Sequence, residues 1–397
     1  MTSQVRPGRD LGVGMVGYAF MGAAHSHAWR TAPEFFDLPA RPRLRALAGR
    51  NLEAAGQTAE RFEWESVTPR WQDLLGRDDV DLIDVCTPGD THAEIAIAAL
   101  EAGKHVLCEK PLANTVEEAE RMAKAAAAAA ESSGVRAMVG FTYRRAPAVA
   151  YARRLVAEGR IGTIRHVRAQ YLQDWLSDAD APLTWRLDKN KAGSGALGDI
   201  GAHIVDMAQF VAGDEIVRVN GMLETFVDTR PVEGVASGIG GVGSADTERG
   251  PVTVDDAAAF LARFGSGAFG TFEATRYASG RRNALRLEIN GTKGSLAFDF
   301  EDMNVLNFYD ATQPEGEQGF RRISVTEPSH PYLEAWWPPG HGLGYEHGFT
   351  HQVVDLVTDL AEGRQPRPSF DDGLRVQKVL AAVENSSAGG GWKEVSG

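Results

Sequence analysis

A glycine cluster near the N-terminus has the spacing that brings a phosphate close to a backbone turn. The run Gly12-Val-Gly-Met-Val-Gly-Tyr-Ala-Phe-Met-Gly22 joins a short apolar segment to a helical pattern. Its last six residues fit the G-x-G-x-x-G fingerprint with alanine in the middle position, which still admits a pyrophosphate. The following helix offers unpaired N–H groups and a positive dipole end. We therefore expect a dinucleotide to contact Gly17, Ala19, Phe20, Met21 and Gly22.

The choice between NAD and NADP depends on the end of the second expected strand. A site that prefers NAD has an acidic residue there, which holds the ribose 2′-hydroxyl. This chain reads Ala48-Gly-Arg-Asn51 instead, without a carboxylate. Arg50 suits a 2′-phosphate, so the pattern slightly favours NADP. A solvated arginine at a helix start is the alternative interpretation.

Three further side chains have types and positions that suit acid–base chemistry. His203 has an imidazole, whose ordinary pKa lies near working pH. Asp199 lies four residues earlier, where a helix would let it orient the ring, although it would also serve as a helix cap. Lys110 ends an apolar strand, at the sheet edge where a lysine can stabilise a developing alkoxide. An ion pair with Glu109 is the alternative for Lys110.

The elements that position these residues begin as an alternation of strands and helices. In the first 140 residues we expect strands at 11–16, 44–48, 82–86, 106–108 and 137–141, and helices at 21–31, 52–62, 91–102 and 116–130. Gly103 follows the third helix, where a left-handed cap needs no Cβ. Strands that are apolar on both faces and alternate with helices predict a parallel sheet between helical layers.

The pattern changes after an expected helix at 147–158. Strands then follow one another with alternating polarity, at 164–171, 252–264, 268–277, 286–290 and 295–300. Glycine-containing joins at 264–268 and 290–294 predict hairpins. We expect an α+β domain with a large, mostly antiparallel open sheet. The glycine-rich stretch 235–250 is predicted to be a mobile loop, and helices return at 345–362 and 371–384.

Length and composition exclude several classes of function. At 397 residues the chain is long enough for two domains, which we place at 1–142 and 143–397, and its C-terminal helices can pack back on the first domain. A net charge of −13 argues against nucleic-acid binding. No apolar stretch of roughly 18 residues and no secretory leader is apparent, which predicts a cytoplasmic protein away from membranes. Cys86 and Cys108 are expected to be buried free thiols, and no Cys/His cluster predicts a metal site.

Several motifs in order along the chain resemble one known family. Besides the glycine turn they are Thr87-Pro-Gly-Asp-Thr-His92, Ala102-Gly-Lys-His-Val-Leu-Cys-Glu-Lys-Pro111 and Gly193-Ser-Gly-Ala-Leu-Gly-Asp-Ile-Gly-Ala-His-Ile-Val-Asp206. Weaker matches follow at 339–347 and 370–377. Together they resemble the glucose–fructose oxidoreductase/inositol dehydrogenase (Gfo/Idh/MocA) family. The resemblance implies a Rossmann domain, a C-terminal domain with an open sheet, and homodimers or homotetramers formed through that sheet.

The resemblance also implies an activity and its residues. Such enzymes move a hydride between NAD(P) and a secondary hydroxyl or ketone of a sugar, sugar derivative or inositol. The implied catalytic residues are Lys110, Asp199 and His203, and Thr87, Pro88, His92, Glu109 and Lys110 would line the cofactor beside Arg50. Sugars present apolar faces to aromatic rings and hydroxyls to polar groups. Expected substrate ligands are Lys110, Asp199, His203, Tyr143, Arg144, Trp175, Trp185, Arg186, His341, Tyr345 and His347.

Two other functions remain open at this point. An enzyme with the same residues can oxidise a sugar transiently, cleave a glycosidic or C–X bond and restore the hydride, with no net redox change. A cofactor-sensing regulator without catalysis is the second alternative. The set of Lys110, Asp199 and His203 argues against the regulator, because a sensor needs no proton acceptor. The role of His25, just past the glycine turn, is open between the cofactor, the substrate and the core.

Overall fold

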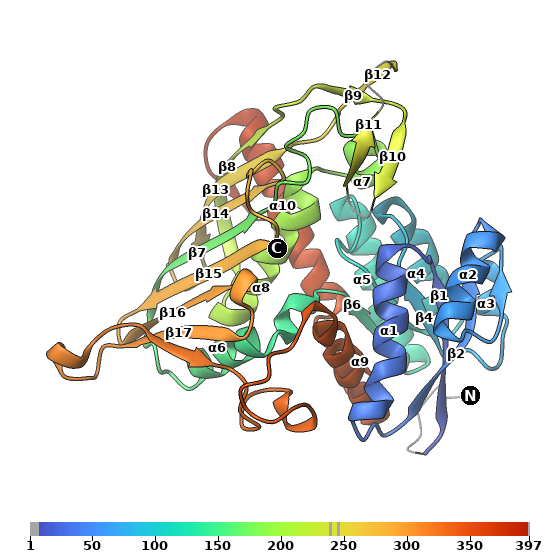
Figure 1. Cartoon of the computed structure of the whole chain (residues 1–397), viewed down its shortest axis with the longest axis horizontal. Coiled ribbons are helices and arrows are strands. Elements are labelled where there is room, and N and C mark those ends of the chain that lie inside the picture. Colours follow the sequence, from blue (N-terminus) through green and yellow to red (C-terminus); the bar gives the residue numbers. More distant parts are fainter. Residues whose placement is uncertain (1–7, 238–239, 244–246, 396–397) are drawn as a thin grey trace. The chain divides into compact units, whose positions relative to one another are not determined.

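A computed structural model describes residues 8–237, 240–243 and 247–395. The contacts divide the chain into two compact units (Figure 1). Unit 1 comprises residues 1–145 and 344–375, and unit 2 comprises residues 146–343 and 376–397. The helix at 345–361 therefore belongs with the N-terminal strands in unit 1.

Unit 1 is built on a parallel six-stranded sheet. Its strand order is β3-β2-β1-β4-β5-β6, the arrangement of doubly wound dinucleotide-binding folds. The strands are β1 (Asp10–Val16), β2 (Arg41–Ala48), β3 (Val67–Thr68), β4 (Leu82–Val85), β5 (His105–Cys108) and β6 (Ala137–Val139). Residues in β4 and β5 are buried throughout, because helices cover both faces of this sheet. The predicted Rossmann architecture is confirmed.

The helices of unit 1 follow from local signals. They are α1 (Phe20–Phe35), α2 (Leu52–Phe62), α3 (Gln72–Leu75), α4 (His92–Glu101), α5 (Val116–Ser132), α9 (Tyr345–Ala361) and the first part of α10 (Phe370–Gly389). Asn51 caps α2 by accepting hydrogen bonds from Glu53 and Ala54. Gly103 follows α4 with φ of +74°, as the sequence predicts. Helix α9 packs along α1, and both contribute to one core with β1 (Figure 1).

Unit 2 is built on a nine-stranded mixed sheet. Its order is β18-β17-β16-β15-β7-β14-β13-β8-β19, and every neighbouring pair is antiparallel except β14 and β7. Both predicted hairpins are present, as β13–β14 and β15–β16. The strands are β7 (Ile164–Leu172), β8 (Ile216–Glu224), β13 (Ala257–Phe264), β14 (Phe269–Thr275), β15 (Ala284–Gly291), β16 (Gly294–Asp299), β17 (Val305–Asp310), β18 (Arg321–Ser324) and β19 (Lys393–Glu394).

Helices pack on one face of the nine-stranded sheet (Figure 1). They are α6 (Pro147–Ala157), α8 (Ala202–Ala212) and the second part of α10, with the short α7 (Lys189–Ala192) beyond the strand ends. A π-helical turn, Leu197–Gly201, leads directly into α8. The burial of β13 alternates along the strand, because one face meets helices and the other does not.

Two sequence expectations about unit 2 are wrong. The strand expected at 252–264 begins only at Ala257, because the amides of Val252 and Thr253 instead donate to the carbonyls of Asp228 and Leu187. The stretch 235–250, expected to be a loop, contributes paired strands: β10 (Gly234–Ser237) with β11 (Gly240–Gly243), and β12 (Arg249–Pro251) with β9 (Thr229–Pro231). Its residues 238–239 and 244–246 lie outside the described part of the chain.

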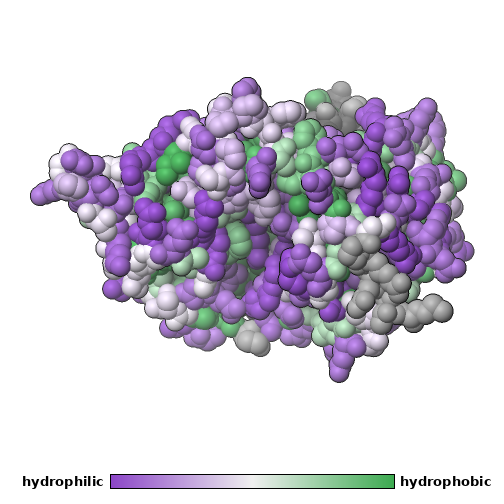
Figure 2. All heavy atoms as spheres, turned by 90° about the horizontal axis from the view of Figure 1, so that it is seen from below, coloured by the Kyte–Doolittle hydropathy of each residue, from purple (hydrophilic) through white to green (hydrophobic). Residues whose placement is uncertain are grey.

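The surface seen in Figure 2 is covered mostly by hydrophilic side chains. On the face drawn in Figure 2, hydrophobic residues form small patches separated by hydrophilic ones. Among the described residues, no helix combines the length and apolar character that crossing a bilayer requires. Cys86 and Cys108 are both buried and unbridged, as expected.

Candidate active site

The glycine turn lies between β1 and α1, where the fingerprint predicts it. Gly17 has φ of +103°, and a Cβ there would lie 2.7 Å from the carbonyl oxygen of Cys86. A Cβ on Gly22 would lie 2.3 Å from the carbonyl oxygen of Gly17. The turn can close this tightly against β4 only with glycine at both positions. Ala19 occupies the N-cap of α1, where a side chain as small as methyl still lets a pyrophosphate approach the backbone.

The N-terminus of α1 suits an anionic ligand. Ala19 provides no side-chain hydrogen bond to the first amides, and the first turn contains no acidic residue. Met21 is half-buried, and Phe20 leaves 49% of its surface exposed. Uncapped amides together with the dipole of a 16-residue helix favour a bound phosphate. The residues present therefore fit the pyrophosphate of a dinucleotide.

Arg50 lies in the loop after β2 and is exposed. Its neighbour Asn51 caps α2, which fixes the backbone of this loop. A Cβ on Gly49 would lie 2.4 Å from the ring of Tyr18, so the loop packs closely over the glycine turn. The guanidinium is thus available at the place where a ribose would lie in a fold of this type.

Residues after β4 form a second part of the same sheet edge. Thr87 and Pro88 lead into α4, and the hydroxyl of Thr91 donates to Pro88 O. His92 is 1% exposed, and its ring nitrogens lie 3.0 Å from Pro111 O and 2.8 Å from Thr87 O. Because both nitrogens contact backbone carbonyls, His92 braces the loops after β4 and β5 against each other. A direct cofactor contact by His92 has no support in this geometry.

Lys110 follows β5 at the carboxyl edge of the parallel sheet, and the peptide bond between Lys110 and Pro111 is cis. The Glu109 carboxylate accepts the Lys110 backbone N–H at 3.2 Å and contacts His25 at 3.0 Å. Glu109 thus pairs with His25 and also holds the backbone at Lys110. A Cβ on Gly140 would lie 2.6 Å from Glu109 Oε1, so the glycine leaves room for this carboxylate.

Two tyrosines gather at the same end of unit 1. Burial, together with the neighbouring Tyr143 and Glu109, raises the pKa of Tyr345 well above its usual value. Tyr345 also stacks on Phe20 with 6.3 Å between ring centroids, and it begins α9. The fold therefore brings Phe20, Glu109, Tyr143 and Tyr345 together, as a site at this sheet edge requires.

Two other predicted ligands of unit 1 have structural partners. Arg144 lies near Asp372, whose pKa it lowers together with Ser369 and Arg367, against the effect of burial. His347 accepts the backbone N–H of Gly344 at 3.0 Å and closes the first turn of α9. The His347 side chain thus fixes the start of α9, a role that does not depend on a sugar.

His25 lies in a buried cluster that the sequence did not reveal. Its Nδ1 lies 3.0 Å from both carboxylate oxygens of Asp84, which also accepts hydrogen bonds from Trp29 and Cys86. The ligand atoms of His25, Asp84 and Cys86 lie within 4.8 Å of one another, the geometry of a possible metal site. Each of these atoms already has a protein partner, so we describe the cluster as an ion-pair network.

In unit 2, Asp199 and His203 lie on either side of the start of α8. Asp199 belongs to the π-helical turn, and its carboxylate lies 3.7 Å from Nη1 of Arg276. The capping role left open for Asp199 is taken by Asp255, which accepts the backbone N–H groups of Gly195 and Leu197. His203 is half-buried, one helical turn further along.

The end of β7 presents polar and aromatic side chains beside these residues. The ring of Tyr171 meets His203 edge-on at 5.9 Å between centroids. Tyr171 donates its hydroxyl proton to Asn283 at 2.7 Å, and Gln173 donates to the same oxygen at 3.0 Å. Trp175 in turn donates its indole N–H to Gln173 at 2.9 Å. This hydrogen-bonded row fixes the side chains of Tyr171, Gln173 and Trp175, and the first of them contacts the imidazole.

The other predicted ligands of unit 2 contact residues outside this row of side chains. The guanidinium of Arg186 lies over the ring of Trp185 at 4.6 Å, and Trp185 is 36% exposed. His341 is exposed, and its Nδ1 contacts Pro338 O at 2.8 Å. Sequence reasoning missed Tyr171, Asp255 and Arg276. Two adjacent acids inside an otherwise apolar run, Asp255-Asp256, were the available signal.

Comparison with known families identifies the chain. Residues 11–141 match the model described as "Oxidoreductase family, NAD-binding Rossmann fold", and residues 149–297 match the "GFO/IDH/MocA C-terminal domain". The chain belongs to the Gfo/Idh/MocA family of oxidoreductases. The family resemblance and the expected oxidoreductase class, with an NAD-binding Rossmann fold, are thereby confirmed.

Individual relatives cover almost the whole chain. A levoglucosan dehydrogenase from Pseudarthrobacter phenanthrenivorans is 43% identical over 390 residues, which are 98% of each chain. A solved oxidoreductase domain protein from Kribbella flavida is 67% identical with a TM-score of 0.93, over 98% of this chain and 100% of the other. A levoglucosan dehydrogenase in complex with NADH and levoglucosan is 42% identical with a TM-score of 0.90, over 98% and 100%.

Proposed function

We propose that the protein oxidises a secondary hydroxyl of a pyranose sugar with a nicotinamide cofactor, and that levoglucosan is the first substrate to test. The observation that carries this proposal is the arrangement of Asp199 and His203 at the start of α8, beside the ordered side chains of β7. The levoglucosan dehydrogenase that is 43% identical over nearly all of both chains supports the choice of substrate.

The residues divide the chemistry between them. When bound, nicotinamide supplies the hydride acceptor. His203 takes the hydroxyl proton, since imidazole is the side chain best matched to proton transfer near neutral pH. The Asp199 carboxylate stabilises the imidazolium that results, and Lys110 stabilises the negative charge that develops on the substrate oxygen. In the reverse direction, the His203 imidazolium returns the proton.

We propose that Gly17, Ala19 and Gly22 hold the pyrophosphate and that NAD is the working cofactor. Support comes from the levoglucosan dehydrogenase structures that contain NADH. The slight preference for NADP that Arg50 suggested has no contact in its favour, and it stays a prediction. The variant Arg50→Ala decides the point: it weakens NADPH binding selectively if Arg50 binds a 2′-phosphate, and it changes NADH and NADPH binding equally if not.

For the sugar, we propose that the second domain, residues 143–397, supplies the apolar platform. Trp175 suits this role, because its indole is fixed by Gln173 while its partly exposed ring can meet the C–H face of a pyranose. Lys110, Tyr143 and Tyr345 are proposed to bind hydroxyls. Trp185, Arg186, Arg144, His341 and His347 remain predictions of lower rank, since their protein partners account for their positions.

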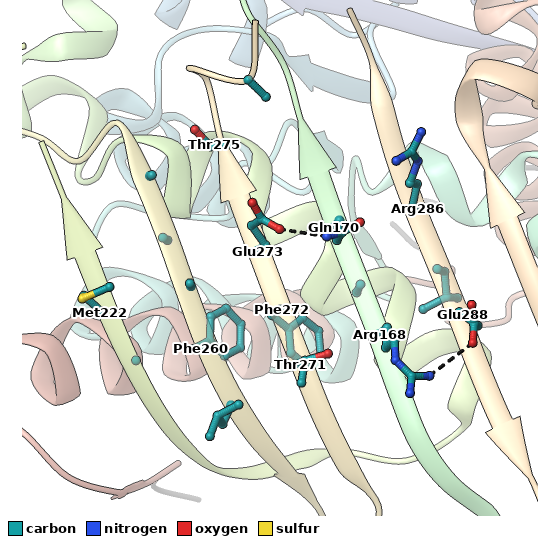
Figure 3. A pocket seen from close by; sticks show the side chains of 18 of the residues that line it. Arg168, Gln170, Met222, Phe260, Thr271, Phe272, Glu273, Thr275, Arg286 and Glu288 are labelled. Atoms are coloured by element: carbon teal, nitrogen blue, oxygen red, sulfur yellow. Dashed lines mark hydrogen bonds and ion pairs between the residues drawn. The ribbon is translucent and has the colours of Figure 1, made fainter. Parts of the chain in front are cut away.

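We also propose that the open face of the nine-stranded sheet binds a second copy of this chain. Its side chains stand on β8, β13, β14, β7 and β15, where Gln170 contacts Glu273 and Arg168 contacts Glu288 (Figure 3). Met222 and Leu261 on the same face are 63% and 39% exposed. Interspersed opposite charges around exposed apolar residues favour a self-complementary contact. We place the assembly in the cytoplasm, where buried thiols stay reduced.

A cofactor-coupled assay tests the proposed function. Purified protein is mixed with NAD or NADP and a panel of pyranoses and inositols, with levoglucosan included, and the absorbance of reduced nicotinamide is followed. We expect one mole of reduced cofactor per mole of sugar oxidised. Turnover of a sugar without a net change in cofactor would favour the transient-oxidation alternative. Cofactor binding without turnover of any sugar would favour the regulator.

A further inference from the structure

One buried arginine of unit 2 has a position that the proposed reaction does not yet use. Arg276 directly follows β14, and its side chain is fully buried, with 0% of its surface exposed. Its backbone N–H donates to Asp256 O at 3.1 Å, and its carbonyl accepts from Leu176 at 3.1 Å. These two hydrogen bonds fix the backbone of Arg276, so its side chain starts from a fixed position.

The guanidinium of Arg276 contacts three different groups. Nη1 lies 3.7 Å from Oδ2 of Asp199, and Nη2 donates to Asp255 O at 2.9 Å. Its central carbon lies 5.4 Å from the centroid of the Trp175 ring. Within the described chain, Nε and Nη1 make no hydrogen bond. Nη1 of this buried cation is therefore not used in a hydrogen bond, and it lies close enough to the Asp199 carboxylate for electrostatic attraction.

The glycine motif before α8 makes room for this arginine. A Cβ on Gly195 would lie 1.8 Å from Asp255 O and 2.8 Å from Nη2 of Arg276. The same Asp255 accepts the amides of Gly195 and Leu197 through its side chain. Burial raises the pKa of Asp255, and the positive charge of Arg276 opposes that shift. The glycine, Asp255 and Arg276 together set the start of the π-helical turn that carries Asp199.

We infer that Arg276 is a positioning residue that holds the Asp199 carboxylate in place for the proton transfer by His203. The inference rests on the proposed function, because it assumes that Asp199 acts in the reaction. Arg276 itself is fully buried, so it reaches the substrate only through Asp199 and through the ring of Trp175. Because Arg276 contacts both Asp199 and Trp175, it links the residues of the proton transfer to the ring proposed to bind the sugar.

A second buried arginine provides a matched control. Arg230 is also 0% exposed, but its Nη1 and Nη2 donate to the carbonyls of Asp178 at 2.6 Å and Leu176 at 2.8 Å. Both of these donors are directed to backbone oxygens rather than to a carboxylate of the site. A variant of Arg230 therefore reports what the loss of a buried guanidinium does to unit 2 in general.

The experiment is a double-mutant cycle between Arg276→Met and Asp199→Asn, with kcat, KM and the cofactor dissociation constant measured for each variant. We expect Arg276→Met to lower kcat by about 10- to 100-fold with little change in cofactor binding, as a small displacement of a reacting group does. The double variant is expected to be no slower than Asp199→Asn alone, because both changes disable one unit. Arg276→Lys is expected to restore part of kcat, and Arg230→Met to leave kcat within about threefold of the wild type.

The outcomes separate this inference from the proposed function. If Asp199→Asn leaves kcat unchanged, the catalytic role of Asp199 is wrong and the inference falls with it. If Asp199→Asn slows the reaction but the two effects multiply in the double variant, Arg276 does not act through Asp199 and the inference alone is overturned. Should Arg276→Met not fold, the same cycle run with Arg276→Lys decides between these outcomes.

Discussion

His25 Nε2 lies 3.0 Å from Oε1 of Glu109, the residue immediately before Lys110. The other ring nitrogen contacts both carboxylate oxygens of Asp84, so one buried imidazole in α1 bridges β4 and the residue that follows β5. Burial lowers the pKa of His25, but the charge and hydrogen bond of Asp84 outweigh it and raise the pKa well above its usual value. The ring is therefore a cation between two carboxylates, and it links the glycine turn to the loop that carries Lys110.

Replacing this cation should destabilise unit 1 strongly. We expect His25→Asn to lower the free energy of unfolding by about 3–5 kcal/mol, because it leaves two buried carboxylates uncompensated. Urea unfolding followed by tryptophan fluorescence measures the change. The control is His27→Asn on the exposed side of the same helix, which should change stability by about 0.5 kcal/mol or less. Equal effects of the two variants would mean that the network contributes no more than a surface contact.

A second histidine predicts a loss of stability in mild acid. His351 is fully buried and contacts Arg145 O at 3.0 Å, and burial lowers its pKa to about 3. Between about pH 6.5 and pH 3 the unfolded chain therefore binds a proton that the folded chain does not, so stability falls as pH falls. This one group removes about 1.4 kcal/mol per pH unit below its unfolded pKa. His25 has the opposite effect, because its pKa is raised in the folded chain. Its contribution to the free energy of unfolding is fully present below the pKa of the unfolded chain and is lost as the pH rises through the pKa of the folded chain.

Comparing wild type with His351→Asn isolates this effect. The asparagine amide can still donate to the carbonyl of Arg145, but it does not titrate. We expect the stability difference between the two proteins, measured by urea unfolding at about pH 7, 6 and 5, to shift in favour of the variant by about 1.4 kcal/mol over the last of these steps. A difference that stays constant with pH would show that His351 is not a buried neutral imidazole.

The glycine turn gives a direct test of the cofactor site. In Gly22→Ala the new Cβ would clash with Gly17 O, and relieving such overpacking costs about 1–3 kcal/mol. We expect dinucleotide binding to weaken by roughly 10- to 100-fold, as seen by quenching of tryptophan fluorescence. Gly56→Ala, in the interior of α2 with nothing within 4 Å of the added atom, should leave binding unchanged and slightly stabilise the helix. Unchanged binding in Gly22→Ala would place the cofactor elsewhere.

Oligomeric state tests the proposed role of the open sheet face. We expect the wild type to sediment as a dimer or tetramer, and Met222→Lys combined with Leu261→Lys to shift it toward the monomer, because charges would then face each other across the contact. Val242→Lys alters a side chain that is 75% exposed on β11, away from that face, and should leave assembly intact. A monomeric wild type, or an oligomer unaffected by the double change, would contradict this interface.

The sequence predicts what depends on local spacing and fails where distant segments meet. The turn at Gly17 and Gly22 and the cap at Gly103 were predictable, because each needs only neighbouring residues. The pairing of Arg276 with Asp199 was not, since the two residues lie on separate elements that packing alone brings together. For the same reason the cap of this helical segment comes from Asp255, which was expected inside a strand and instead accepts the backbone N–H groups of Gly195 and Leu197.

Short and glycine-rich segments were the other limit. Strand β3 has only two residues, Val67 and Thr68, and gives no periodic signal. The glycines of β10 and β11 suggested a loop, because their composition lacks the side chains that mark strands, yet their backbones pair. In the same way, nothing local distinguishes a histidine such as His92, held by two carbonyls, from one that binds a ligand.

The most direct test of the central claim is the rate of NAD reduction by levoglucosan in wild type, His203→Asn and the control His27→Asn, whose imidazole is exposed. We predict stoichiometric NADH formation by the wild type, a kcat lower by about 100- to 10,000-fold in His203→Asn with cofactor binding preserved, and a near-normal rate in His27→Asn. A His203→Asn enzyme that reduces NAD as fast as the wild type would contradict the assignment of His203 as the proton acceptor.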